Sequence, residues 1–331
     1  MGIVLFCAVL FAAERVYFGL NWLNSPLDKE LSSPANSFTL KLKPGSVFSD
    51  ISHRVGSVVP VQTLTWSLHA RLSGISRNLK AGEYQIHTGM TPLQISELIV
   101  SGKVLEYNFR IQEGWTVSQM REALLSAENL TLETSHYSSY DIAEMLGIAH
   151  DRAEGFFFPD TYTYVNGDTD TSILLRAHKT MQRKLALLWK ERDVGLSLTT
   201  PYEALTLASI IEKETGRDSD RAKISEVFNN RLKNNMRLQT DPSVIYGLGK
   251  SFDGDLIRKH LKTDGRYNTY TRKGLTPTPI SLPGHNSIYA ALHPESGNLL
   301  YFVGRGDGSS HFSSNLNDHL NAVRRYQLRK H

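Results

Sequence analysis

Two glutamates, Glu212 and Glu214, flank a lysine at the end of an apolar run that reads LASIIEKET over residues 207–215. Burying an ionised carboxylate among apolar residues is costly, so a carboxyl group in such a place tends to stay protonated near neutral pH. A protonated carboxyl group is what a general acid requires. At helical spacing the two glutamates fall on opposite flanks of the apolar face, with Glu214 slightly nearer its centre. Helical phase alone does not choose between them, and a helix end with two surface carboxylates is the alternative.

Two later stretches carry further polar groups. Gln239 and Asp241 lie in NMRLQTDPSVIYGLG, and Tyr267 and Asn268 lie in RYNTYTRKGL. In the second stretch, tyrosine faces combined with amide and hydroxyl groups suit the recognition of a pyranose ring. Both stretches also have a structural interpretation, because Asp-Pro is a turn or N-cap signal and tyrosine-rich loops often serve packing.

Other kinds of chemistry lack their signatures. The chain contains no G-x-S-x-G, no H-E-x-x-H and no P-loop sequence, and its single cysteine, Cys7, excludes an internal disulfide and a cysteine-based zinc site. We therefore expect no metal and no cofactor. The net charge of +4 is mild, and no basic stripe is interleaved with aromatics, so nucleic acid is not an expected partner.

The elements that must position these residues are mainly helical. Apolar residues at helical spacing predict long helices over 172–192, 201–215 and 221–235. A short strand over 299–304 and a helix over 315–328 are expected near the C-terminus. The phenylalanine-rich stretch EGFFFPDTYTY, residues 154–164, is interpreted as a buried turn that docks two domains.

The N-terminal third of the sequence has a different pattern, which predicts strands as well as helices. Extended segments over 38–43, 82–87 and 105–111 are each associated with a turn and an amphipathic helix. Ser46, Thr91 and Thr116 are the expected helix N-caps. Three such units predict a small α+β module that resembles the LysM-like modules of glycan-binding proteins.

The first residues are strongly apolar. IVLFCAVLFAA, residues 3–13, is shorter than a membrane span, but VYFGLNWL, residues 16–23, continues the apolar character. Without a convincing cleavage site, residues 1–23 are expected to be an uncleaved transmembrane anchor, followed by a Ser/Pro/Asn-rich linker over 24–37. The alternative is a soluble protein with an apolar first helix.

Several motifs in order resemble the YceG-like (MltG) family of endolytic murein transglycosylases. They are, in chain order, EGFFFPDTY, LASIIEKET, VFNNRL, MRLQTDPSVIYG, YNTY, PG, AALHP and YFV. The resemblance extends over about residues 38–325. It implies an α+β protein with an N-terminal membrane anchor, a LysM-like module over 38–108 and a mixed α+β catalytic domain over 109–331. It also implies location in the bacterial inner membrane as a single-pass protein with the catalytic domain in the periplasm, where peptidoglycan polymerases are expected partners.

The resemblance places the catalytic acid at Glu214. It implies cleavage between N-acetylmuramic acid and N-acetylglucosamine within nascent glycan strands, leaving 1,6-anhydro ends and terminating strand elongation. Glu212, Gln239, Asp241, Tyr267 and Asn268 are the expected substrate-binding residues. The sequence departs from the family pattern near the C-terminus, where His311 directly precedes Phe312, whereas His319 matches a family histidine. A muramidase-type hydrolase and a non-catalytic peptidoglycan-binding membrane protein are the alternative functions.

Overall fold

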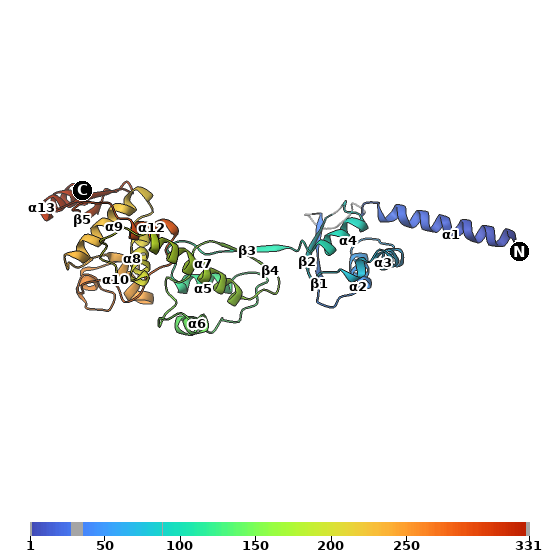
Figure 1. Ribbon diagram of the computed structural model, residues 1–331, viewed down its shortest axis with the longest axis horizontal. Helices are drawn as coiled ribbons and strands as arrows, with labels where there is room; N and C mark the ends of the chain where they lie inside the picture. Colours follow the sequence, from blue (N-terminus) through green and yellow to red (C-terminus); the bar gives the residue numbers. More distant parts are fainter. Residues whose placement is uncertain (1, 28–35, 88, 329–331) are drawn as a thin grey trace. The chain divides into compact units, whose positions relative to one another are not determined.

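The computed structural model describes residues 2–27, 36–87 and 89–328, and the side chains of these residues except for 2–9 (Figure 1). The chain forms two compact units. Unit 1 comprises Met1–Tyr107 and Thr163–Asp168, and unit 2 comprises Asn108–Tyr162 and Thr169–His331. Both units combine helices with strands, so the predicted α+β class is confirmed.

The described residues of unit 1 form a two-stranded antiparallel sheet, four α-helices and a short 3-10 helix. The extended segments predicted over 38–43 and 82–87 form this sheet: Phe38 pairs with Ile86 and Leu40 pairs with Tyr84. Leu40 and Tyr84 are buried in the core. The elements of this unit are β1 (Ser37–Leu42), β2 (Gly82–His87), α1 (Gly2–Leu23), α2 (Phe48–Gly56), α3 (Thr63–Leu72), the 3-10 helix η1 (Ile75–Arg77) and α4 (Pro92–Ser101).

Two of the three predicted N-caps are confirmed. Thr91 accepts a hydrogen bond from the backbone N–H of Gln94, and Thr116 accepts one from Gln119, each at 3.2 Å. The prediction for Ser46 is wrong, because α2 begins one residue later, after Val47. The Ser46 hydroxyl instead accepts the backbone N–H of Lys43 at 3.1 Å, and so closes the turn that precedes the helix.

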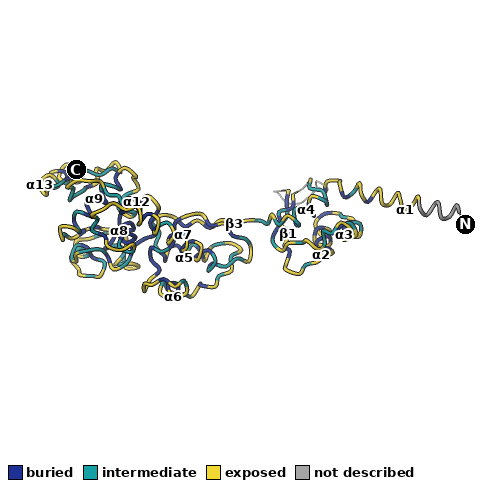
Figure 2. Tube along the Cα trace, in the orientation of Figure 1, coloured by how far each residue is buried: buried dark blue, intermediate teal, exposed yellow. Residues whose placement is uncertain are grey.

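Helix α1 has two contrasting parts. Near its C-terminal end, Leu23 is 1% exposed in the core of unit 1, and the Trp22 ring packs edge-on against Trp66. Residues 10–18 are exposed (Figure 2). They include the large apolar side chains of Phe11 and Phe18. Within the described part of the chain, no helix meets the combined length and hydropathy requirements of a membrane span. Most of the predicted linker, residues 28–35, lies outside the described residues.

Unit 2 is built around α8, whose residues from Ala204 to Ile211 are all buried (Figure 2). Helix α12 packs against α8, and both contribute to the principal core of the unit. The helices of this unit are α5 (Val117–Leu125), α6 (Ser139–Met145), α7 (Asp170–Glu191), α8 (Pro201–Glu214), α9 (Asp218–Lys233), α10 (Asp241–Leu248), η2 (Gly249–Ser251), α11 (Arg258–Lys262), α12 (His285–Leu292) and α13 (Leu316–Tyr326).

Two further strand pairs complete the fold. Strand β5 (Tyr301–Gly304) pairs antiparallel with β6 (Ser310–Ser313) in unit 2. Strand β3 (Glu106–Arg110) pairs with β4 (Thr161–Val165), and each of these strands has residues in both units. The chain therefore leaves unit 1 at Tyr107, returns to it at Thr163 and leaves it again at Asp168.

Candidate active site

Glu214 is the last residue of α8, where the buried part of that helix ends. The helix is well specified at its start, because Thr200 accepts the backbone N–H of Glu203 at 3.2 Å and Pro201 occupies the first turn. The apolar residues between these ends anchor the helix in the core. The helix therefore holds the Glu214 carboxyl group at a fixed place on the edge of the core.

The surroundings of Glu214 favour its protonated form. Burial raises the pKa of Glu214 to about 7; the Thr240 hydrogen bond opposes the shift, the charge of Asp241 adds to it, and Arg231 lowers the pKa. The Thr240 hydroxyl donates to Oε1 of Glu214. At neutral pH the carboxyl group is therefore divided between its acid and base forms, as a residue that must both donate and accept a proton requires.

Glu212 has different partners, although its side chain is only 7% exposed. Its Oε2 accepts the backbone N–H of Gly284 at 2.9 Å, and its Oε1 lies 3.8 Å from Nη2 of Arg221. Arg221 also bonds Asp218 and donates to Ser287 at 3.1 Å. Glu212 is thus held in a charged network that connects α8, α9 and the start of α12, whereas Glu214 faces Thr240.

Hydrogen bonds bring the two predicted sugar-binding stretches together beside Glu214. The backbone N–H of Thr240 donates to Thr269 Oγ1 at 3.0 Å, and that of Gln239 donates to the Thr269 carbonyl at 3.2 Å. Tyr270 Oη donates to Oδ1 of Asp241 at 2.5 Å. Residues 239–241 and 268–270 therefore form one wall, joined to Glu214 through Thr240.

The remaining predicted residues differ in how free they are. Gln239 is exposed and has a left-handed backbone with φ of 51°. Tyr267 is half-buried, packs edge-on against Tyr246, and has its hydroxyl 3.0 Å from Thr278 Oγ1. The Asn268 side chain is buried, and its Nδ2 lies within hydrogen-bonding distance of three carbonyls, those of His260, Leu261 and Thr263. Asn268 thus shapes its loop from within.

Arg231 is a charged residue of this site that the sequence did not indicate. It is 6% exposed, and its Nε and Nη1 donate to the Leu300 and Leu238 carbonyls, each at 2.7 Å. Its guanidinium lies over the Tyr301 ring, 5.3 Å from the centroid, and the same ring stacks on His319 at 5.0 Å. Burial lowers the pKa of His319, and the charge of Arg231 adds to this effect. These contacts extend the electrostatic surroundings of Glu214 to β5 and α13.

His311 has more peripheral contacts. Its Nδ1 lies 3.4 Å from Nη2 of Arg305, and its ring contacts that of Tyr326 with centroids 5.7 Å apart.

Glu154, in the stretch interpreted as a buried turn, is a second carboxyl group with an unusual environment. It accepts the backbone N–H of Val117 at 3.0 Å and the Tyr246 hydroxyl at 3.1 Å. Burial raises the pKa of Glu154 to about 7, against these hydrogen bonds. A glutamate before three phenylalanines was the available signal. Glu154 joins α5 to α10, the helix that carries Asp241 at its first turn.

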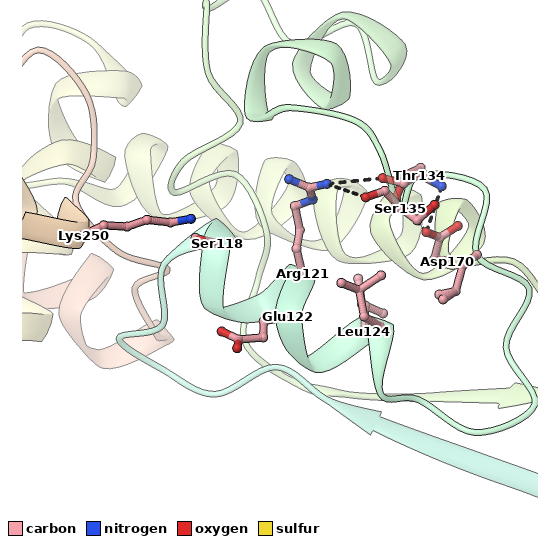
Figure 3. A pocket seen from close by; sticks show the side chains of 10 residues that line it. Ser118, Arg121, Glu122, Leu124, Thr134, Ser135, Asp170 and Lys250 are labelled. Atoms are coloured by element: carbon pink, nitrogen blue, oxygen red, sulfur yellow. Dashed lines mark hydrogen bonds between the residues drawn. The ribbon is translucent and has the colours of Figure 1, made fainter.

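A separate cavity of about 350 Å³ lies elsewhere in unit 2 (Figure 3). Its wall combines a few apolar side chains with charged ones, and Arg121 donates from it to the Thr134 and Ser135 carbonyls at 3.4 and 3.3 Å. It is lined by Ser118, Arg121, Glu122, Leu124, Leu125, Leu132, Thr134, Ser135, Asp170 and Lys250. None of these is a predicted catalytic or sugar-binding residue.

Comparison with known proteins shows which family this chain matches. The model of the YceG-like family matches residues 40–325. A protein of Bacillus subtilis named endolytic murein transglycosylase is 29% identical over 330 residues, which cover 92% of this chain and 88% of the relative. A protein of Streptococcus pneumoniae strain R6 with the same name is 27% identical over 356 residues, or 96% of this chain and 63% of the relative, so this chain spans less than two thirds of the pneumococcal protein.

A solved structure supports the same relationship. The crystal structure of a putative YceG-like protein from Listeria monocytogenes superposes with a TM-score of 0.57 at 30% sequence identity. The match covers 86% of this chain and 98% of the Listeria chain.

Proposed function

Because the chain belongs to the YceG-like family, we propose that it is an endolytic murein transglycosylase, which cleaves peptidoglycan glycan strands at internal positions. The observation that carries this proposal is the Glu214 carboxyl group, held at the end of a buried helix with its pKa raised to about 7 by burial. One such group can serve as acid and then as base.

The proposed reaction proceeds in two half-steps. Protonated Glu214 donates its proton to the oxygen that joins N-acetylmuramic acid to N-acetylglucosamine, and the bond from that oxygen to muramyl C1 breaks. The carbonyl oxygen of the 2-acetamido group supplies electrons to C1. Ionised Glu214 then accepts the proton of the muramyl C6 hydroxyl, whose oxygen bonds to C1 and closes a 1,6-anhydro ring. The acetamide is restored, and no water is consumed.

The residues around Glu214 have distinct proposed roles. The Thr240 hydroxyl holds the carboxyl group in place. Gln239, Asp241 and Tyr267 contact the sugars. Burial raises the pKa of Glu214, and the charge of Asp241 adds to that shift. Asn268 positions the loop that carries Tyr267 and Tyr270. Glu212 supports the site by joining α8 to Arg221 and Gly284.

The products and two matched variants test the proposal. Purified glycan strands are digested with the full chain, and the released fragments are weighed by mass spectrometry. We expect 1,6-anhydro ends, lighter than reducing ends by one water. Glu214→Gln keeps the shape of the side chain but removes its proton, so activity should fall by about 10⁴ or more, near the top of the range for general acid–base catalysis. Glu212→Gln retains an oxygen for the Gly284 N–H and should lose much less.

Other outcomes would favour other functions. Reducing ends would indicate a muramidase-type hydrolase with a second carboxylate. Strand binding without any turnover would indicate a non-catalytic peptidoglycan-binding protein. Normal activity in a folded Glu214→Gln protein would contradict the assignment of the acid.

We further propose the location and division of the chain that the family resemblance implies. Residues 1–23 form a single-pass anchor in the inner membrane, and residues 38–108 form a LysM-like glycan-binding module. The catalytic domain over 109–331 lies in the periplasm beside peptidoglycan polymerases. The exposed apolar side chains of α1 support a membrane location. Protease added to spheroplasts should degrade most of the chain, whereas protection of the full chain would contradict this topology.

A further inference from the structure

Helix α3 of unit 1 has a face that the fold leaves uncovered. Its buried side carries Trp66 and Ala70, both 0% exposed. Leu64, Leu68 and Leu72 are 87%, 59% and 79% exposed. At 100° per residue these leucines are centred about 180° from the buried pair. The helix is therefore apolar on both sides, and its outer side is a continuous line of leucines, here called the leucine stripe.

The leucine stripe adjoins a second exposed apolar surface. Helix α1 approaches α3 so closely that a Cβ at Gly19 would lie 2.9 Å from Cγ2 of Thr65. On the helical wheel of α3, Thr65 flanks the leucine stripe. Beyond this contact α1 exposes Phe18, Tyr17 and Val16, each by at least 60%. The stripe thus lies on a helix that packs beside α1, and both helices expose large apolar side chains.

The segment of sequence that carries the stripe has charges of one sign. Residues 51–82, between Asp50 and Glu83, contain no acidic residue, and their basic residues Arg54, Arg71, Arg77 and Lys80 are all exposed. Arg71 flanks the stripe on the side opposite to Thr65. An apolar line flanked by a basic side chain, in a segment without acidic residues, is typical of a helix that lies in the interface of a membrane with anionic lipids.

We infer that the leucine stripe of α3 lies in the headgroup region of an anionic membrane, so that unit 1 contacts the bilayer through α3 in addition to α1. A surface built for a second protein would not require a 32-residue segment free of acidic residues. This inference goes beyond the proposed enzymatic function and rests only on the proposed membrane location of the chain.

A fluorescent probe on the stripe tests the inference in the full chain. Leu68→Cys, in a Cys7→Ser background, is labelled with an environment-sensitive dye, and the protein is reconstituted in phosphatidylcholine vesicles with or without phosphatidylglycerol. In anionic vesicles we expect a blue-shifted emission that lipid-borne nitroxides quench. Both effects should weaken in neutral vesicles and at high salt.

A control probe at another position and a vesicle flotation assay show whether the dye signal comes from contact of the stripe with lipid. Glu97→Cys is the control. The buried faces of α3 and α4 meet where Trp66 Nε1 donates to Ser96 Oγ at 2.9 Å, and Glu97 is exposed on the outer face of α4. Glu97 and the leucine stripe therefore face away from each other. The control probe should remain in water. If the chain floats with anionic vesicles while the probe at position 68 stays in water, the inference is overturned and α1 alone makes the contact. A blue shift without nitroxide quenching that grows with protein concentration would overturn it in favour of a second copy of the chain.

Discussion

The charge of Asp241 influences the protonation of its neighbour Glu214. Asp241 accepts the Tyr270 hydroxyl, and its negative charge makes ionisation of Glu214 less favourable. The pKa of Glu214, raised to about 7 mainly by burial, thus also depends on a carboxylate at the first turn of another helix. The protonation of the proposed acid is therefore a property of the whole wall around it.

The pH dependence of activity follows from this arrangement. The first half-step requires protonated Glu214, so kcat/KM should fall about tenfold per pH unit above the pKa of the acid. In wild type this decline should begin near pH 7. Asp241→Asn removes the charge that raises this pKa, so the decline should begin at lower pH. Measurement of kcat/KM against pH checks both expectations.

A second aspartate provides the control for that shift. Asp255 is exposed in the segment after η2, and Asp255→Asn removes the same charge without touching the wall. Its pH profile should match wild type. A decline that stays in place or moves to higher pH in Asp241→Asn would contradict the proposed electrostatics.

For individual residues, the sequence indicated the two candidate glutamates but not the residues that they contact. Helical phase placed both glutamates of LASIIEKET at the edge of the apolar face and could not separate them. They differ in their partners: Thr240 lies 26 residues after Glu214, and Gly284 lies 72 residues after Glu212. Such tertiary contacts leave no periodic signal in the chain. The same reason explains why Arg231 and Glu154 were not predicted as charged groups of functional interest.

Among the elements, α1 ends inside the core of unit 1. Leu23 and Leu27 are 1% and 3% exposed, and the backbone N–H of Leu27 donates to the Met90 carbonyl at 2.9 Å. The last turn of α1 is thus part of the fold of unit 1. A soluble fragment that starts at residue 24 would lack a buried leucine.

Two leucines of α1 test this assignment. Leu23→Ala should lower the free energy of unfolding of unit 1 by about 2–5 kcal/mol, as is usual when a buried leucine is truncated. Leu20→Ala, three residues earlier, should change it little because Leu20 is 50% exposed. Hydrogen exchange of β1 and β2 amides measures both effects. Equal losses in the two variants would contradict the described burial.

Elements with strong local signals were predicted well. The extended segment predicted over 38–43 corresponds to β1, and the predicted caps Thr91 and Thr116 begin α4 and α5. Ser46 failed because a serine hydroxyl can close a turn as readily as it can cap a helix, and only the backbone around Lys43 decides between them.

In the whole molecule, Glu83 connects three separate stretches of unit 1. Its side chain is 4% exposed and contacts Lys41 Nζ at 2.5 Å. The Tyr107 hydroxyl donates to it at 2.8 Å, and Asn166 Nδ2 donates at 2.5 Å. Burial alone would raise the pKa of Glu83, but these three partners outweigh it and lower the pKa. Glu83 therefore holds the returning segment, 163–168, against the strands of unit 1.

Replacement of Glu83 should loosen that segment. Glu83→Ala leaves the Tyr107 and Asn166 donors without their acceptor, at an expected cost of about 2–3 kcal/mol in the stability of unit 1. Because the pKa of Glu83 is lowered, its contribution is present above the usual range of a glutamate pKa and is lost as the pH falls below it. Thermal unfolding should therefore separate wild type and variant at pH 7 and bring them together in acid. Glu97→Ala, at an exposed site on α4, is the control and should match wild type at both pH values.

The double crossing between the units restricts how such a chain can be recombined. Unit 1 consists of two separate segments of the chain, and the second, Thr163–Asp168, lies between two segments of unit 2. A single genetic crossover after residue 107 would deliver a small unit without Asn166, and so without one of the three partners of Glu83. It would also divide β3, so that an incoming Glu106 and Tyr107 would face a β4 from the other parent. The small unit can therefore be exchanged intact only together with the segment that returns to it, and the two units are expected to pass between genomes as one piece.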